Sequence, residues 1–166
     1  MREFRITRLM LLISIILLLA SPLLSQDNIY WGDSVPDSWN GNWPENFLTA
    51  CEKSEFKHTA NNQDILEYFA MIQWNSEYVH IFDMFISDRG RTCPVIVMSN
   101  PRVTNPEQAK ESGKTIIYLQ GGIHPGESEG KEALLILIRD IVFGDKTYLL
   151  DSLIIMVCPN FNVDGN

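Results

Sequence analysis

The stretch TIIYLQGGIHPGESEGKEALLILIRDIV, Thr115–Val142, carries the strongest structural pattern in this chain. Its first part, Thr115–Gln120, is a short apolar run that ends in two glycines, which is typical of a buried parallel strand. Its second part, Glu127–Val142, predicts a helix whose centre is apolar on all sides. Because such a helix must be covered, the order of strand and helix indicates an α/β arrangement in which the helix packs on a sheet.

The segments on either side of this stretch extend the pattern. Leu153–Cys158 is a second apolar run, and its place after the helix predicts a βαβ unit with parallel strands. Upstream, the sequence predicts a helix at Gln63–Trp74, capped by Asn61 or Asn62. A hairpin should follow, with strands Tyr78–Ser87 and Cys93–Ser99 joined by the turn Asp88–Arg91. Asn105–Glu111 is expected to form one or two helical turns. The residues after Cys158 are expected to form a loop.

The start of the chain predicts a targeting segment. Arg2, Arg5 and Arg8 precede the apolar run Leu9–Ala20, and small residues follow it. This order predicts a signal peptide over residues 1–25, with a signal anchor as the alternative. We therefore expect an exported protein, periplasmic or extracellular, that meets a membrane only through an uncleaved signal segment. Residues 26–60 are expected to be irregular, with loops or short helical turns.

Composition narrows the class of partner. Of the 166 residues, 45% are apolar and 20% are charged, which is ordinary for a globular protein. The net charge is −8, because 21 acidic residues outnumber 13 basic ones. Affinity for nucleic acid depends on clustered lysine and arginine, so no nucleic acid partner is expected.

The three cysteines, Cys51, Cys93 and Cys158, lack the short spacing of a zinc site. Export would allow a disulfide, and Cys51–Cys93 is one pairing that the sequence leaves open. Cys158 ends an apolar run and fits a small buried side chain. We expect no catalytic role for any of the three.

Of the three histidines, His124 lies in a sequence context that is typical of a metal site. His124 follows the predicted strand and two glycines, and Glu127 lies three residues later at a helix entrance, so the imidazole and carboxylate can converge. Both groups are zinc ligands, and open α/β sheets bind ligands at the carboxyl ends of their strands. In the competing interpretation, His124 forms a hydrogen bond within the loop, and the negative charge of Glu127 stabilises the N-terminal end of the helix dipole. His58 and His80 lack this context and are expected to be structural.

The motif HPGESEGKE at residues 124–132 resembles the H-x-G-E-x-E-G-K-E motif of the zinc carboxypeptidases, the metallopeptidases similar to carboxypeptidase A, as found in their secreted bacterial branch. The ending PNFNVDG, Pro159–Gly165, is similar to the N-P-D-G loop of that family, with Val163 in place of the proline. The predicted hairpin around Ser87–Arg91 also fits. The resemblance covers about residues 60–166.

The resemblance implies a fold, a cofactor and a reaction. The implied fold class is α/β, with a mixed, largely parallel sheet flanked by helices on both faces, and residues 61–166 would be its truncated N-terminal part. His124 and Glu127 would be two ligands of Zn²⁺, and a zinc-activated water would hydrolyse a bond in a peptide or protein substrate. The third ligand, the substrate-binding arginines and the general base are expected beyond Asn166, so this chain alone is expected to be inactive. The oligomeric state is not predicted.

Several alternatives stay open. Glu129 follows Glu127 by two residues and should face away, about 200° round the helix. Asp164 would reach the site only if neighbouring loops meet, and a turn role is the simpler account. Gly126 stands where pancreatic-type enzymes carry an arginine, which leaves the substrate preference open. The alternative functions are a related zinc amidohydrolase of the aspartoacylase or desuccinylase type, and a truncated, non-catalytic binding protein.

Overall fold

The computed structural model describes residues 43–165 of the chain, so the predicted signal peptide at residues 1–25 lies outside the described residues. The elements follow one another in this order: the 3₁₀ helix η1 (Glu45–Phe47), helices α2 (Ala50–Lys53) and α3 (Asn62–Trp74), strands β1 (Val79–Ile86) and β2 (Thr92–Met98), helix α4 (Pro106–Ser112), strand β3 (Thr115–Gln120), helix α5 (Ser128–Val142), the 3₁₀ helix η2 (Thr147–Asp151) and strand β4 (Leu153–Cys158). Between residues 43 and 165, no helix is both long enough and apolar enough to cross a membrane.

The four strands form one mixed sheet in the order β1-β2-β4-β3. β3 and β4 run parallel, as the βαβ pattern predicts, whereas β2 runs antiparallel to both β1 and β4. The mixed α/β class is therefore confirmed, but the sheet is not largely parallel over residues 43–165. The reason is that the hairpin β1–β2 joins the sheet beside β4 and contributes both antiparallel pairings.

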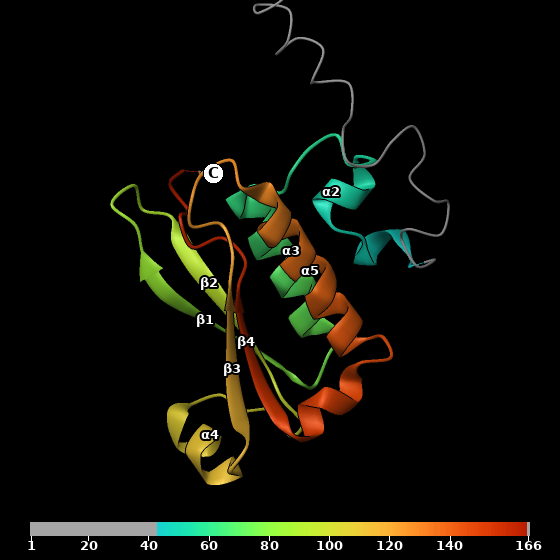
Figure 1. Cartoon of the computed structure of the whole chain (residues 1–166), viewed down its shortest axis with the longest axis vertical. Coiled ribbons are helices and arrows are strands. Elements are labelled where there is room, and N and C mark those ends of the chain that lie inside the picture. The colour runs from blue at the N-terminus through green and yellow to red at the C-terminus, as the bar shows by residue number, and fades with distance from the viewer. Residues whose placement is uncertain (1–42, 166) are drawn as a thin grey trace, which may run out of the picture. The chain divides into compact units, whose positions relative to one another are not determined.

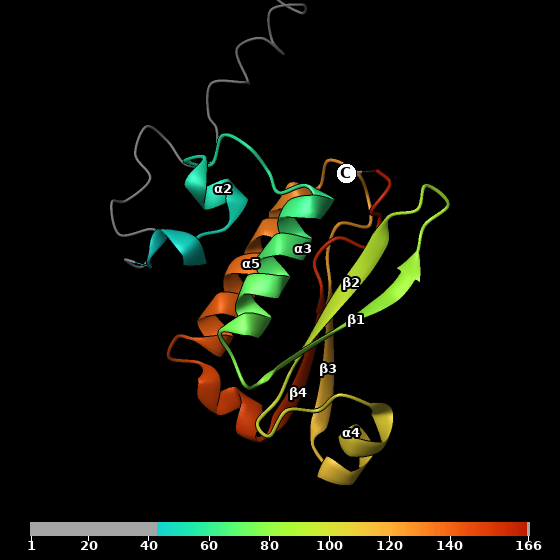
Figure 2. The same cartoon turned by 180° about the vertical axis from the view of Figure 1, so that it is seen from behind.

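Helices lie against both faces of the sheet. α3 and α5 run side by side over one face (Figures 1 and 2), where both contribute to the largest apolar core. On the opposite face, Ala109 of α4 packs with Val97, Val103 and Ile154. Alternation along each strand explains the two cores, since successive side chains point to opposite faces.

Strand β3 is more exposed than its apolar sequence predicts. Ile116 is 52% exposed and Tyr118 is 43% exposed. β3 ends the strand order, with β4 as its partner among residues 43–165, and α4 lies at one end of the sheet (Figure 1). The prediction of a buried parallel strand was therefore right for the pairing and wrong for the burial in this part of the chain.

The cysteines do not support the pairing Cys51–Cys93. Cys51 lies in α2, where Glu132, Glu52 and Lys131 are its charged neighbours. Cys93 lies at the start of β2, and its sulfur atom is 3.5 Å from that of Cys158 at the end of β4. All three cysteines are buried thiols in this structure. Two cysteines distant in sequence meet because β2 and β4 are neighbours in the sheet.

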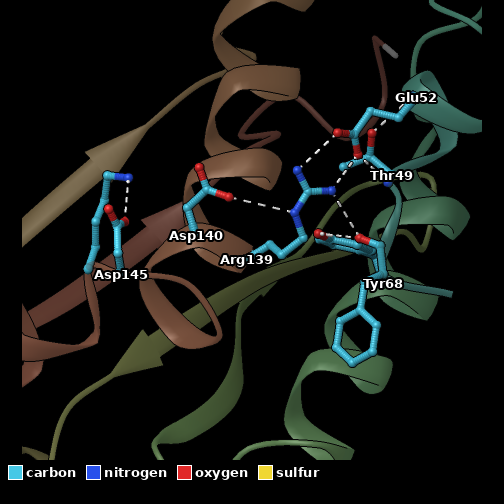
Figure 3. Close-up of polar contacts among 8 residues, drawn as sticks. Thr49, Glu52, Tyr68, Arg139, Asp140 and Asp145 are labelled. Carbon is cyan, nitrogen blue, oxygen red and sulfur yellow. Dashed lines mark hydrogen bonds and ion pairs between the residues drawn. The ribbon is translucent and has the colours of Figure 1, made fainter. Parts of the chain in front are cut away.

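A buried ion pair fixes residues 43–54 to helix α5 (Figure 3). The Arg139 guanidinium donates to both carboxylate oxygens of Glu52, over 2.7 and 3.0 Å, and to the carbonyl of Phe47 over 3.2 Å. The side chains of Arg139 and Glu52 are each only 2% exposed. The ring of Trp43 lies 5.1 Å from the guanidinium carbon, so this tryptophan has a structural contact. The ion pair between Arg139 and Glu52 therefore links residues 43–54, which lack a regular hydrophobic pattern, to the core helix α5.

Helix α3 begins with a capping box. The Asn61 side chain accepts hydrogen bonds from the backbone N–H groups of Gln63 and Asp64, and the Asp64 carboxylate accepts from the N–H of Asn61. Replacing Asn61 with alanine should leave these amide donors without their partner and lower the free energy of unfolding by about 1 kcal/mol. Urea denaturation followed by circular dichroism measures this loss. Alanine at Gln63, an exposed helical position, is the control and should leave the midpoint unchanged.

Candidate metal site

His124 and Glu127 lie in the loop between β3 and α5, and their side chains meet. The Nδ1 atom of His124 is 3.0 Å from the Oε1 atom of Glu127, and both side chains are about two-thirds exposed, at 71% and 67%. A turn brings them together, because the N–H of Glu127 donates to the carbonyl of His124 over 3.3 Å. Helix α5 begins at Ser128, so the pair precedes the helix and Glu127 is its N-cap residue. The sequence spacing predicted this convergence, although the turn and not the helix produces it.

The loop that carries the pair is held against the loop after β4. The N–H of Gly121 donates to the carbonyl of Cys158 over 2.9 Å, and the carbonyls of Gly121 and Gly122 accept from the N–H groups of Phe161 and Asn162 over 3.0 and 2.8 Å. These bonds continue the pairing of β3 with β4 beyond the strands. The glycines therefore serve the contact between the two loops.

Gly122 is required by both its conformation and its neighbours. Its φ is +59°, and a Cβ atom there would lie 2.8 Å from the side-chain oxygen of Asn160 and 2.9 Å from its Cα. Gly122→Ala should therefore lower the free energy of unfolding by about 1–3 kcal/mol, through backbone strain and displacement of the Asn160 loop. Thermal unfolding measures the loss. Gly113→Ala, at φ +67° with open space around the Cβ, separates the strain from the clash and should cost less.

The other candidate ligands are not joined to this pair. The Asp164 carboxylate accepts a hydrogen bond from the Ser87 hydroxyl over 2.8 Å, so it ties the loop after β4 to the hairpin β1–β2. Arg91 supports the same junction by donating to the carbonyl of Val163 over 2.9 Å. Glu129 is exposed on α5. Residues 43–165 hold no cluster of three or more His, Cys, Asp or Glu side chains that could bind a metal ion.

His58 and His80 do not join the pair either. His58 is exposed in the loop before α3, and its backbone N–H donates to the Ser54 hydroxyl over 3.0 Å. His80 lies in β1 on the face that carries α4, beside Phe82 and Val97. The structural roles predicted for these two histidines stay predictions.

Two further residues of the 124–132 motif have a structural role that sequence reasoning missed. Lys131 is buried, and its ammonium group donates to the carbonyl of Ala60. The carboxylate of Glu132 accepts from the N–H of Ala60 over 2.7 Å and from the hydroxyl of Thr59. These residues therefore fix the chain just before α3 to the start of α5. In the sequence, the only sign of this contact is that a lysine and a glutamate follow the candidate pair His124 and Glu127 at a fixed spacing in the motif.

The nitrogen of His124 and the oxygen of Glu127 could provide part of the coordination of one zinc ion. Zinc binds imidazole nitrogen and carboxylate oxygen at about 2.0–2.2 Å, which separates two ligands of a tetrahedral ion by roughly 3.4 Å. The 3.0 Å between Nδ1 of His124 and Oε1 of Glu127 is close to that separation. A catalytic zinc site has three protein ligands, and residues 43–165 bring two candidate donors together here without a third.

The sequence profile of the zinc carboxypeptidases matches residues 65–166, which is more than half of the chain. The chain belongs to the zinc carboxypeptidase family. Among curated relatives, a probable carboxypeptidase 2 of Trichophyton verrucosum (strain HKI 0517) is 36% identical over 85 residues, and carboxypeptidase 2 of Trichophyton rubrum is 35% identical over 85 residues. These alignments cover 49% of this chain and 16% and 15% of the two relatives, so the chain spans about a sixth of their length.

Solved structures of carboxypeptidases share the fold. Carboxypeptidase A of Helicoverpa armigera matches with a TM-score of 0.55 at 17% identity, over 64% of this chain and 25% of that one. Thrombin-activatable fibrinolysis inhibitor matches with a TM-score of 0.57 at 17% identity, over 76% of this chain and 30% of that one. At such low identity the likeness concerns the fold alone. It confirms that this zinc carboxypeptidase chain contains part of a carboxypeptidase-like α/β domain.

Proposed function

We propose that this chain supplies the first two metal ligands of a zinc-dependent peptidase that removes residues from the carboxyl end of peptides. The single observation that carries the proposal is the meeting of His124 Nδ1 and Glu127 Oε1 at 3.0 Å, within a segment that matches the zinc carboxypeptidases. Bound zinc would lower the pKa of a water molecule to about 7 and stabilise the developing oxyanion.

The residues of this chain would hold and orient the metal. His124 and Glu127 would bind it from a loop whose position the bonds of Gly121 and Gly122 to the opposite loop determine. Both ligand side chains are exposed, so the site is open to a peptide approaching from solvent. A third ligand, a general base and the residues that bind the substrate would come from outside residues 43–165. We also propose that the protein is exported, on the basis of the basic and apolar residues at its start.

The test uses protein purified from its natural source, with its intact mass measured first. We expect one zinc per protein by metal analysis, release of the last residue from short peptides, and loss of that release with 1,10-phenanthroline. A second assay offers N-acyl amino acids. Hydrolysis of these compounds without peptide cleavage would favour the amidohydrolase alternative, and peptide binding without hydrolysis of either substrate would favour the binding protein.

A further inference from the structure

Two buried cysteines face each other beneath the loops that carry the candidate metal site. The sulfur atoms of Cys93 and Cys158 lie 3.5 Å apart, and both residues have no exposed surface. They pack with Val95 and Val163 in a small apolar cluster of their own. This cluster also contacts Phe85 and Met156. The Cys93 thiol also lies within hydrogen-bond distance of the backbone carbonyls of Asn160 and Phe161, at 3.7 and 4.0 Å.

The sheet places the two cysteines on the same face. Val97 of β2 pairs with Met156 of β4, and Cys93 and Cys158 lie an even number of residues from this pair. Because side chains alternate between faces, the two sulfur atoms project to the side that carries α4. They come from sequence positions 65 residues apart, but neighbouring antiparallel strands hold them in reach of one another.

The two sulfur atoms lie within hydrogen-bond distance of each other. Cys93 and Cys158 form a hydrogen bond, which lowers the pKa of Cys158 and raises the pKa of Cys93, so Cys158 is the group that ionises first. Hydrogen bonds from Tyr118 and from the backbone of Asn160 also favour the Cys158 thiolate. By contrast, burial and the carboxylates of Glu132 and Glu52 raise the pKa of Cys51 to about 11. Cys51 therefore stays a thiol at neutral pH and is a poor nucleophile.

We infer that Cys93 and Cys158 form a disulfide bond when the chain meets a disulfide donor, with Cys51 remaining a free thiol. A bond requires the sulfur atoms to approach by about 1.5 Å from their present separation. The inference rests on the sheet register and the facing sulfur atoms, and it goes beyond the proposed hydrolysis.

The reaction needs one equivalent of a low-molecular-weight or protein disulfide as the oxidant. During refolding, while Cys158 is still accessible, its thiolate attacks one sulfur of the donor, which forms a mixed disulfide and releases the first donor thiolate. Cys93 then loses its proton and attacks the Cys158 sulfur, which releases the second donor thiolate. In total, two protein thiols lose two protons and two electrons, and one donor disulfide becomes two thiols.

The bond would stabilise the part of the fold that positions the metal pair. The carbonyl of Cys158 accepts the hydrogen bond from Gly121, where the loop leading to His124 leaves β3. Cys93 lies next to the hairpin whose Ser87 is bonded to Asp164. Joining β2 to β4 at this point would therefore restrain the hairpin and both loops at the same end of the sheet.

The experiment refolds the fully reduced 166-residue chain in a buffer of reduced and oxidised glutathione, and compares it with chain refolded in dithiothreitol. We expect the free thiols, counted after denaturation, to fall from three to one, and the intact mass to decrease by about 2 Da. Protease digestion should yield one linked pair of peptides that contains Cys93 and Cys158. Cys51→Ser is the matched control, and its thiol count should fall from two to none.

Three outcomes would overturn the inference. The first is retention of all three thiols in chain that circular dichroism shows to be folded. The second is a lasting glutathione adduct on Cys158 without closure, and the third is a linked peptide that contains Cys51. Cys158→Ala should keep two free thiols under the same conditions, and because the mapping uses the unchanged chain, the test stands even if this variant folds poorly.

Discussion

In a full-length form of the proposed zinc peptidase, replacing His124 with alanine is expected to remove both the bound zinc and the hydrolysis of peptides. Only a two-ligand site would then remain, made of Glu127 and the third ligand that we propose outside residues 43–165. Changing a residue that only supports a metal ligand costs about 10–100-fold in metal affinity, so loss of a direct ligand should cost at least roughly 100-fold. Metal analysis of purified protein and an assay of peptide cleavage measure the two losses.

His58→Ala is the matched control for this experiment. His58 is exposed in a loop, as His124 is, and its bonds to Ser54 come from its backbone. Its substitution should leave the zinc content and the rate of cleavage unchanged. Unchanged zinc in the His124 variant would show that His124 is not a ligand, and an equal loss in the His58 variant would show that the wrong histidine was chosen.

Elements whose signals are local could be predicted from the sequence. Helix α3 follows from the cap at Asn61 and the apolar spacing after it, and hairpin β1–β2 follows from two apolar runs around a turn with Gly90 at φ +74°. The predicted start of helix α5, Glu127, is one residue too early, because the same residue types occur at the N-cap position and at the first helical position. Each of these features depends on residues within a few positions of one another.

Features that depend on distant residues could not be predicted in the same way. The place of β2 beside β4 adds a second antiparallel pairing to that of the hairpin β1–β2, and it also brings Cys93 to Cys158. The exposure of Ile116 depends on what covers its face of the sheet, which the apolar run cannot reveal. The bonds from Lys131 and Glu132 to Ala60 join residues about seventy positions apart.

The candidate metal site combines both kinds of information. The spacing of His124 and Glu127 is local, and it predicted that their side chains converge. The assignment of Zn²⁺ rests on residue chemistry and on membership of the family, and their role as ligands stays a prediction. The loop contacts that position the pair, from Gly121 and Gly122 to Phe161 and Asn162, appear only in the folded chain.

Glu52→Ala is expected to cause a large loss of stability. It would leave the Arg139 guanidinium, 2% exposed, without its bidentate partner, and breaking a buried pair in this way costs about 3–5 kcal/mol. Urea denaturation at neutral pH measures the free energy of unfolding. Glu55→Ala is a control in the same segment, since its ion pair with Lys57 is exposed and should not affect the midpoint.

The ion pair must be separated from the helix cap, because Glu52 also belongs to the capping box of α2 with Thr49. Thr49→Ala removes the bond from the N–H of Glu52 to the Thr49 hydroxyl without removing the pair, and it should cost about 1 kcal/mol. A clearly larger loss in Glu52→Ala therefore points to the pair. Replacing both Glu52 and Arg139 with leucine should cost less than Glu52→Ala, because no charge then stays buried without a partner. If Glu52→Ala costs no more than Thr49→Ala, the guanidinium has reached solvent by a local rearrangement. Residues 43–54 would then be held to α5 by their apolar contacts, such as Phe47 against Phe143, rather than by charge.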